Sequence, residues 1–306
     1  MGYSFSFPWE VTEMEWLQTH ISATGISIIS AFSLLGEPIM LVLILGFLYW
    51  SYDKNTGKII GKTVLFGLTL NTMLKNIVLR RRPYFDHPEI KLFRTVDSTA
   101  DIYDIKAQGY SFPSGHATNS VTLYGFLALK TKKKWMRIPA VILPLLVGFS
   151  RIVVGAHYPT DVLGGWAVGI IAAAIISILQ IRFQNTALLH GILMLLVIPG
   201  LFYCQSEDYF TNFGLLTGLL FGSLIEEKFI NFKDAKSPVK MILRLLGGIT
   251  VYYLLNVILK APFSNEFLES GTRISLLVRA GRYAIIAFVD FGIYPMLFRF
   301  PDNRKS

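Results

Sequence analysis

The stretch that decides the fold runs from residue 160 to residue 181 and reads TDVLGGWAVGIIAAAIISILQI. It has the length of a membrane-crossing helix, because roughly 20 mostly apolar residues cross about 30 Å of hydrocarbon. The whole chain has a similar character: 53% of its 306 residues are hydrophobic, 16% are charged, and the mean hydropathy is +0.50. Soluble domains carry about 25% charged residues. The composition therefore predicts an integral membrane protein.

Further apolar runs lie on both sides of this stretch, and together they predict an all-α, polytopic membrane helical bundle with about nine transmembrane helices. The predicted spans are residues 25–50, 59–79, 114–130, 136–154, 160–181, 186–204, 210–229, 238–260 and 275–298. Residues 1–24 carry aromatic side chains among polar ones, which is typical of an amphipathic segment in the membrane interface. We therefore expect an interfacial segment (1–24), a catalytic membrane domain (25–184) and additional C-terminal transmembrane helices (185–306).

The net charge of +9 comes mostly from short loops between the apolar runs, so it indicates membrane orientation rather than nucleic-acid binding. Four basic groups fall on one side of the nine predicted spans, which the positive-inside bias makes cytoplasmic. They are Lys54, Lys58 and Lys62; Lys130, Lys132, Lys133, Lys134 and Arg137; Lys228, Lys233, Lys236 and Lys240; and Arg299, Arg304 and Lys305. The cluster Arg80, Arg81, Arg82, Lys91 and Arg94 then faces outward against the bias, and an anionic substrate is one reason for such a cluster.

Three blocks at the outer ends of the spans carry groups suited to phosphate chemistry. In the first, Lys75 and Arg82 are seven residues apart and share one helix face before Pro83. In the second, Ser114 and Gly115 begin an apolar run, where backbone amides and the helix dipole attract anions. Each block also has a structural interpretation, as snorkelling cations or as an ordinary helix cap.

Histidines in the second and third blocks suit acid–base and nucleophilic chemistry. His116 lies in the first turn after Ser114, within reach of a bound phosphate. Asp161 follows His157 by four residues and can orient its ring, while Arg151 adds a third cation. For His157 and Asp161 the alternative is a polar turn whose aspartate only caps a helix. Three segments converging on one side of the membrane favour an active site.

Lys75-x6-Arg82-Pro83, Pro113-Ser114-Gly115-His116 and Ser150-Arg151-x5-His157-x3-Asp161 resemble the three signature motifs of the type 2 phosphatidic acid phosphatase (PAP2) superfamily. The resemblance covers roughly residues 60–180. It implies that His157 is the nucleophile, Asp161 its orienting partner and His116 the general acid. It also implies that a phosphate-binding set of Lys75, Arg82, Ser114, Gly115 and Arg151 holds the phosphoryl oxygens, without metal or other cofactor. Nine spans with the N-terminus outside resemble the glucose-6-phosphatase and sphingosine-1-phosphate phosphatase layout.

The function expected from this resemblance is hydrolysis of a lipid phosphate or diphosphate through a phosphohistidine. The expected partners are the lipid substrate and membrane lipids. Substrates of the phosphatidic acid, phosphatidylglycerophosphate, polyprenyl diphosphate and sphingoid phosphate types all remain open. A bacterial plasma membrane is the expected location, because the chain has no Asn-x-Ser/Thr glycosylation site. The positive-inside bias places the expected site on its outer side. Alternatives are a phosphatase of a soluble ester, phosphate transfer to another acceptor, and a lipid transporter or flippase that binds headgroups with the basic cluster.

Polar residues elsewhere in the predicted spans have structural interpretations. Glu37-Pro38 interrupts the first span and predicts a kink. His190 is expected to be a packed histidine with one hydrogen bond. Arg279 and Arg282 either extend the anion site or pair with carboxylates and headgroups. The single cysteine, Cys204, excludes an intrachain disulfide.

Overall fold

The computed structural model describes residues 2–131 and 134–299. Lys132, Lys133, Arg304 and Lys305, which entered the orientation prediction, lie outside these ranges. Within them the regular structure is helical apart from one isolated bridge between Tyr3 and Arg80. The chain forms two compact units. The first unit contains Met1–Leu41, Gly67–Ser177 and Phe202–Ser206, and the second contains Val42–Phe66, Ile178–Leu201 and Glu207–Ser306.

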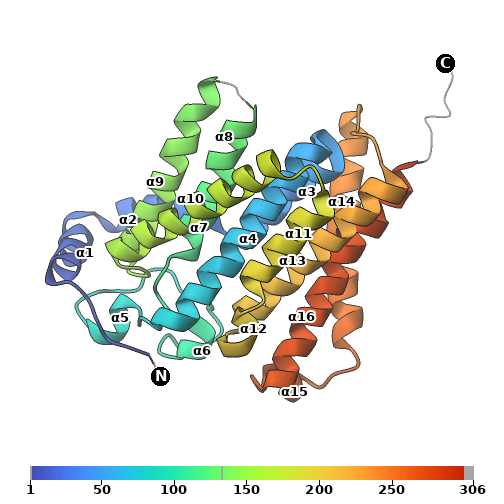
Figure 1. Ribbon diagram of the computed structural model, residues 1–306. Coiled ribbons are helices and arrows are strands. Elements are labelled where there is room, and N and C mark those ends of the chain that lie inside the picture. The colour runs from blue at the N-terminus through green and yellow to red at the C-terminus, as the bar shows by residue number, and fades with distance from the viewer. Residues whose placement is uncertain (1, 132–133, 300–306) are drawn as a thin grey trace. The chain divides into compact units, whose positions relative to one another are not determined.

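The first unit holds all three sequence blocks. Its helices are α1 (Pro8–His20), α2 (Ala23–Ala31), α5 (Pro83–Asp86), α6 (Ile105–Gln108), α7 (Gly115–Ser120), α8 (Phe126–Thr131), α9 (Arg137–Val153) and most of α10 (Pro159–Arg182). It also holds α4 (Lys54–Val78) from Gly67 onward. Helix α1 begins with a proline at its first position, and Ser22 and Ser114 cap α2 and α7. Figure 1 shows α8 and α9 side by side in this unit.

Small residues bring the start of α7 against the first turns of α10. A Cβ atom added at Gly165 would lie only 2.4 Å from the carbonyl oxygen of Ser114. The Gly165 carbonyl oxygen also accepts a hydrogen bond of 2.9 Å from the Thr118 hydroxyl group. The Ser114 amide donates to the carbonyl oxygen of Asp161 at 2.9 Å. This close packing places the second and third sequence blocks next to each other.

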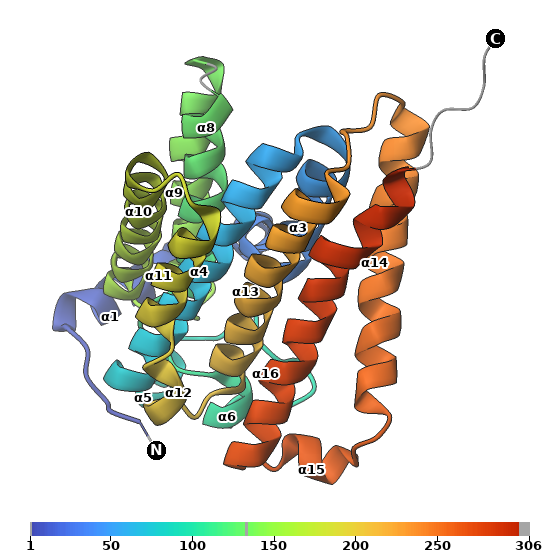
Figure 2. The same cartoon turned by 45° about the vertical axis from the view of Figure 1, so that its right-hand side comes forward.

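The second unit is a helical bundle with tightly packed glycines. Its helices are most of α3 (Pro38–Phe47), the start of α4, α11 (Thr186–Val197), α13 (Glu207–Ile225), α14 (Pro238–Lys260), α15 (Asn265–Glu269) and α16 (Arg273–Phe288). The short helix α12 (Gly200–Tyr203) falls at a boundary between the units. Helices α13 and α16 lie side by side in both Figure 1 and Figure 2. A Cβ atom at Gly218 would lie 2.2 Å from the Ala284 carbonyl oxygen, so this glycine permits close backbone approach.

The described helices do not support nine transmembrane spans. Three of them are long and apolar enough to cross a membrane: Pro159–Arg182, Thr186–Tyr203 and Pro238–Lys260. A fourth is possible if Pro8–His20 and Ala23–Gly36 form one span, although these helices are bent by 114°. We therefore correct the nine-span prediction to three or four candidate spans in an all-helical membrane fold.

Breaks and polar residues explain why the other predicted spans fall short. Residues 25–50 divide into α2, a 3₁₀ segment (Phe32–Gly36) and α3, with Glu37 in an extended conformation before Pro38. This break confirms the interruption predicted at Glu37-Pro38. Residues 114–130 form α7, a π-helical segment (Val121–Gly125) and α8, which follow one another with helical backbone angles, so this stretch is irregular but not broken. An average of hydropathy along the sequence does not register such breaks.

Candidate active site

The residues predicted for catalysis meet within the first unit. His157 lies in the turn that joins α9 to α10, and Asp161 lies in the first turn of α10. The guanidinium Nη1 of Arg82 is 3.3 Å from His157 Nε2. Since arginine only donates hydrogen bonds, Nε2 must be the accepting nitrogen. The proton of the neutral ring therefore sits on Nδ1, the nitrogen that faces Asp161.

The carboxylate of Asp161 lies close to His157 without a direct hydrogen bond. Its Oδ2 is 3.6 Å from His157 Nδ1, and the Ser111 hydroxyl oxygen is 3.5 Å from the same nitrogen. Ser111 donates a short hydrogen bond to Oδ2, which also accepts one of 2.8 Å from the Tyr158 amide. The predicted His157–Asp161 pair is therefore brought together, at a distance longer than a hydrogen bond. Such contacts are often long before a substrate binds.

His157 is held in its neutral form. Burial lowers the pKa of the His157 ring well below its usual value of 6.5, and the charges of Arg82, Lys75 and Arg151 lower it further. Burial has this effect because it penalises the charged form of the ring. A neutral imidazole has a free nitrogen lone pair, which is what a nucleophile requires.

Arg82 and Lys75 are fixed by the segment that precedes the second block. Arg82 Nε donates to the carbonyl oxygens of Gln108 and Gly109, at 2.9 and 3.0 Å, and Nη1 donates to that of Ala156 at 2.9 Å. Lys75 Nζ donates to the carbonyl oxygen of Tyr110 at 2.5 Å. The segment 108–110 thus fixes both cations of the first block before it reaches Ser111.

Arg151 and His116 complete the cluster and retain polar atoms that lack partners among the described residues. Arg151 is almost fully buried and donates from Nη1 to the Ser33 hydroxyl oxygen at 3.2 Å. Its Nε and the Nε2 of His116 are buried with no hydrogen-bond partner in the described part of the chain. Buried polar atoms are normally paired, so unpaired ones suggest a place where a ligand binds. Ser114 caps α7 at the Ala117 amide, with Gly115 directly after it.

The basic cluster of Arg80, Arg81, Arg82, Lys91 and Arg94 does not act as one anion site. Arg80 is buried between Glu10 and Asp161, Arg81 pairs with Asp86 at 3.2 Å, and Arg94 pairs with Glu37. Of these arginines, Arg82 is the one in contact with His157. The interpretation of the cluster as a shared substrate site is thus corrected, because carboxylates already pair with the other three arginines. Ser111, Arg80, Thr160 and Glu10 were missed as site neighbours.

Polar residues of the second unit are largely paired with one another. Lys58 Nζ contacts Glu226 at 2.7 Å and Glu227 at 3.1 Å. Arg279 pairs with Glu207, so of the two predicted alternatives for this arginine, pairing with a carboxylate is confirmed. Arg282 donates a hydrogen bond of 3.1 Å to Asn256 Oδ1. His190 is buried with one hydrogen-bonded nitrogen, as predicted, through Lys62 Nζ at 3.1 Å.

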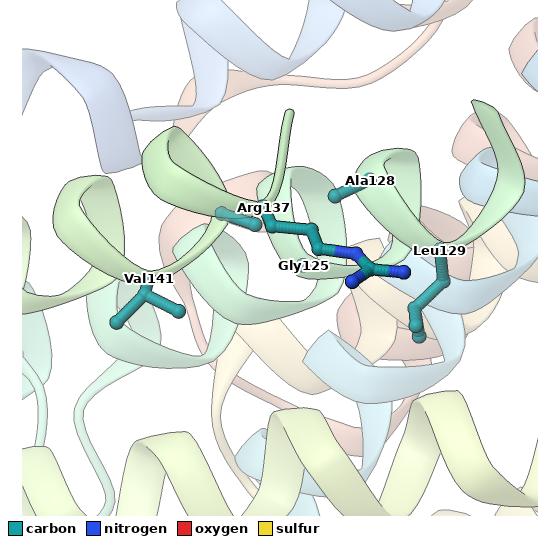
Figure 3. A pocket seen from close by; sticks show the side chains of 6 residues that line it. Gly125, Ala128, Leu129, Arg137 and Val141 are labelled. Atoms are coloured by element: carbon teal, nitrogen blue, oxygen red, sulfur yellow. The ribbon is translucent and has the colours of Figure 1, made fainter. Parts of the chain in front are cut away.

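A hollow of about 560 Å³ lies between α8 and α9, away from the predicted site residues. Figure 3 shows the Arg137 side chain reaching across it toward Leu129. Its other lining residues are small or apolar, namely Gly125, Ala128, Ala140 and Val141. The hollow therefore carries no acid–base chemistry of its own. No group of three or more His, Cys, Asp or Glu side chains within residues 2–131 and 134–299 is arranged to hold a metal ion.

Comparison with known proteins identifies the family of the chain. Residues 57–185 match the PAP2 superfamily, and residues 210–302 match the transmembrane extension of PAP2 superfamily phosphatases. The chain is 31% identical over 159 residues to phosphatidylglycerophosphatase B of Bacillus subtilis, a match that covers 48% of this chain and 68% of the relative. The chain therefore belongs to the PAP2 superfamily.

Two further relatives are both named undecaprenyl-diphosphatases. An undecaprenyl-diphosphatase of Sulfolobus acidocaldarius is 35% identical over 130 residues, and undecaprenyl-diphosphatase BcrC of Bacillus subtilis is 34% identical over 125 residues. Each match covers 41% of this chain. The chain spans little more than half the length of these two relatives, 58% and 56% respectively.

Proposed function

We propose that this protein removes phosphate from a lipid phosphate or lipid diphosphate through a covalent phosphohistidine on His157. The observation that carries the proposal is the 3.3 Å contact between His157 Nε2 and Arg82. It aims the accepting nitrogen of a neutral histidine at a cation suited to holding a phosphoryl group. The lipid character of the substrate is supported by the apolar candidate spans and by the names of the three relatives.

In the first half-reaction, His157 Nε2 attacks phosphorus and the bond from phosphorus to the leaving oxygen breaks. His116 donates a proton to that oxygen, so the leaving alcohol or lipid monophosphate carries a hydroxyl group there and not a negative charge. Asp161 holds the ring and stabilises the positive charge that develops on it. Lys75, Arg82, Ser114, Gly115 and Arg151 bind the phosphoryl oxygens and stabilise charge in the transition state.

In the second half-reaction, water attacks the phosphohistidine. His116, now deprotonated, takes a proton from the water as its oxygen bonds to phosphorus. The bond between phosphorus and Nε2 breaks, inorganic phosphate leaves, and neutral His157 is restored. The two steps balance, and they require neither metal nor cofactor, as the family resemblance implies.

The site lies in our proposal on the outer face of a bacterial plasma membrane. Residues 1–24 lie in the interface, residues 25–184 form the catalytic membrane domain, and residues 185–306 add C-terminal transmembrane helices. Exposed aromatic residues on the N-terminal segment, including Trp9 and Trp16, support an interfacial position. The orientation is tested with Trp16→Cys and Tyr103→Cys, each in a Cys204→Ser background, by labelling intact and opened cells with a membrane-impermeant thiol reagent. Labelling of both positions in intact cells is expected, and labelling only in opened cells would contradict the outer location.

The test is phosphate release by the purified protein in excess EDTA. The substrates are phosphatidic acid, phosphatidylglycerophosphate, undecaprenyl diphosphate, sphingosine-1-phosphate and glucose-6-phosphate. We expect chelator-resistant release from at least one lipid, its loss in His157→Ala, and normal release in the matched control His20→Ala, which changes an exposed histidine of α1. Release only from glucose-6-phosphate would replace the lipid proposal with a soluble ester, and release that survives in His157→Ala would reject the mechanism.

A further inference from the structure

A buried charge network joins the N-terminal helix to the candidate active site. Its three charged members are Glu10 on α1, Arg80 before α5, and Asp161 on α10, whose exposed fractions are 0%, 1% and 0%. Arg80 Nη1 donates to Asp161 Oδ1 and Arg80 Nη2 donates to Glu10 Oε2, both at 2.7 Å. One guanidinium therefore links two carboxylates that are 151 positions apart along the chain, from position 10 to position 161.

Arg80 determines which oxygen of Asp161 faces His157. The guanidinium occupies Oδ1, and the Tyr158 amide and Ser111 hydroxyl group occupy Oδ2, which lies 3.6 Å from His157 Nδ1. With both oxygens held, the carboxylate cannot rotate away from the ring. A planar guanidinium gives this directional control because its N–H groups have a fixed fork geometry.

Glu10 in turn holds Arg80. Its Oε2 accepts from Arg80, and its Oε1 accepts from the Thr160 amide at 3.1 Å and from the Thr160 hydroxyl group at 2.5 Å. Thr160 Oγ1 also accepts a hydrogen bond of 2.7 Å from Arg80 Nη1. The rings of Phe5 and Tyr158 lie 4.8 and 3.9 Å from the Arg80 guanidinium carbon. Phe5 and Glu10 thus bring the N-terminal segment into direct contact with Arg80.

We propose that Arg80 and Glu10 are positioning residues for the reaction, acting on His157 through Asp161. The N-terminal helix is then part of the working enzyme, although it lies outside the residues that match the PAP2 superfamily. The effect of Arg80 and Glu10 on kcat rests on the proposed phosphohistidine function. Their effect on the tautomer of His157 does not depend on any substrate.

The test uses the full-length protein and the variants Arg80→Lys and Glu10→Gln. Lysine keeps the charge and loses the fork, and glutamine keeps the shape and loses the charge. The matched control is Arg81→Lys, which changes the neighbouring arginine that pairs with Asp86. We expect kcat to fall by about 10- to 100-fold in the two network variants, the loss typical of a hydrogen bond to a charged group. KM stays within about twofold in both, because neither residue touches the substrate, and the control retains wild-type kcat.

The second readout is ¹⁵N NMR of protein labelled at its histidines, with the signal of His157 assigned by His157→Asn. We expect the wild type to show one tautomer with the proton on Nδ1, and Arg80→Lys to show a mixture. Size-exclusion chromatography reports folding, and Glu10→Gln decides the question if Arg80→Lys does not fold. Wild-type kcat with an unchanged His157 signal in a folded network variant would overturn the proposal. A wild-type protein inactive on every lipid would reject the proposed function, and the NMR comparison would still decide the positioning role.

Discussion

Two buried charge clusters, one in each unit, differ in what neutralises their cations. In the second unit, Lys58 contacts two carboxylates, Glu226 and Glu227. In the first unit, Arg151 is equally buried, yet it makes no ion pair with any residue that the structure describes, and its Nε has no partner there. A buried charge without a counter-ion is costly. The comparison indicates that the second cluster stabilises the fold, whereas the first is arranged for an anionic ligand.

The largest effect on stability is expected when the cluster of the second unit is broken. Glu226 is fully buried and accepts hydrogen bonds from Lys54, Lys58 and the Phe232 amide. Glu226→Leu leaves the buried ammonium group of Lys58 and the partly buried one of Lys54 with less compensation, and breaking a buried ion pair typically costs about 3–5 kcal/mol. We expect a strongly lowered midpoint of thermal unfolding, with near-normal phosphate release by the molecules that remain folded. A Glu226→Leu protein with wild-type stability would contradict the structural role of this cluster.

The opposite pattern is expected when the cation of the first cluster is removed. Arg151→Met should lower kcat/KM by about 10²- to 10³-fold, the loss that follows removal of one donor to a developing negative charge. The thermal midpoint should change little, because no ion pair with a described residue is lost. Steady-state kinetics and thermal unfolding on one preparation give both values. If Arg151→Met had a strongly lowered thermal midpoint and a normal kcat/KM, the first cluster would stabilise the fold and would not bind the substrate.

The dependence of activity on pH sharpens the comparison at His157. Its lowered pKa means that the unfolded chain gains a proton as pH falls below 6.5, whereas the folded protein does not. The contribution of His157 to stability is therefore constant above pH 6.5 and declines below it.

A histidine with the usual pKa would be about three-quarters protonated at pH 6. We expect kcat/KM at pH 6 to be no lower than at pH 7, after correction for substrate ionisation, because His157 stays neutral while the general acid His116 must carry a proton.

That correction is measured by ³¹P NMR titration of the substrate alone. An acid limb centred at pH 6.5 or above, and not attributable to the substrate, would show that the ring is not held neutral.

The smallest effect is expected for Arg279, which pairs with Glu207 near the surface of the second unit. Partly exposed ion pairs contribute about 0–1 kcal/mol, so Arg279→Gln should hardly change the thermal midpoint. Kinetic constants should also remain at wild-type values, since the arginine is already paired. A raised KM in this variant would revive the idea that Arg279 extends the anion site.

The local parts of the site were predictable only in part, although their residues are close in sequence. His157 and Asp161 are four residues apart, and this spacing predicted that they lie close together. The shared helix face predicted for Lys75 and Arg82 is wrong, because α4 ends at Val78 and Arg82 has an extended backbone before α5. The carbonyl groups of residues 108–110 bind both side chains instead. The three motifs also predicted the PAP2 superfamily, which the comparisons confirm. The roles of the individual residues stay predictions until they are measured.

The long-range parts were not predictable from one sequence. Nothing in the chain indicates that Glu10 lies against Arg80, because neither spacing nor periodicity relates a residue of α1 to one 70 positions later. The basic run groups Arg80 with Arg82, but Arg80 binds Asp161 whereas Arg82 contacts His157. The span count failed for another reason: hydropathy averages do not register helix breaks such as Glu37-Pro38.

The most direct test of the central claim is to trap the covalent intermediate. Wild-type protein is mixed with a ³²P-labelled lipid phosphate, quenched within milliseconds in alkaline detergent, where phosphohistidine is stable, and digested for peptide mapping. We predict label on the peptide that contains His157, which appears and decays at the rate of turnover and is absent in His157→Asn. Turnover without labelled protein, or label that persists in His157→Asn, would contradict the account.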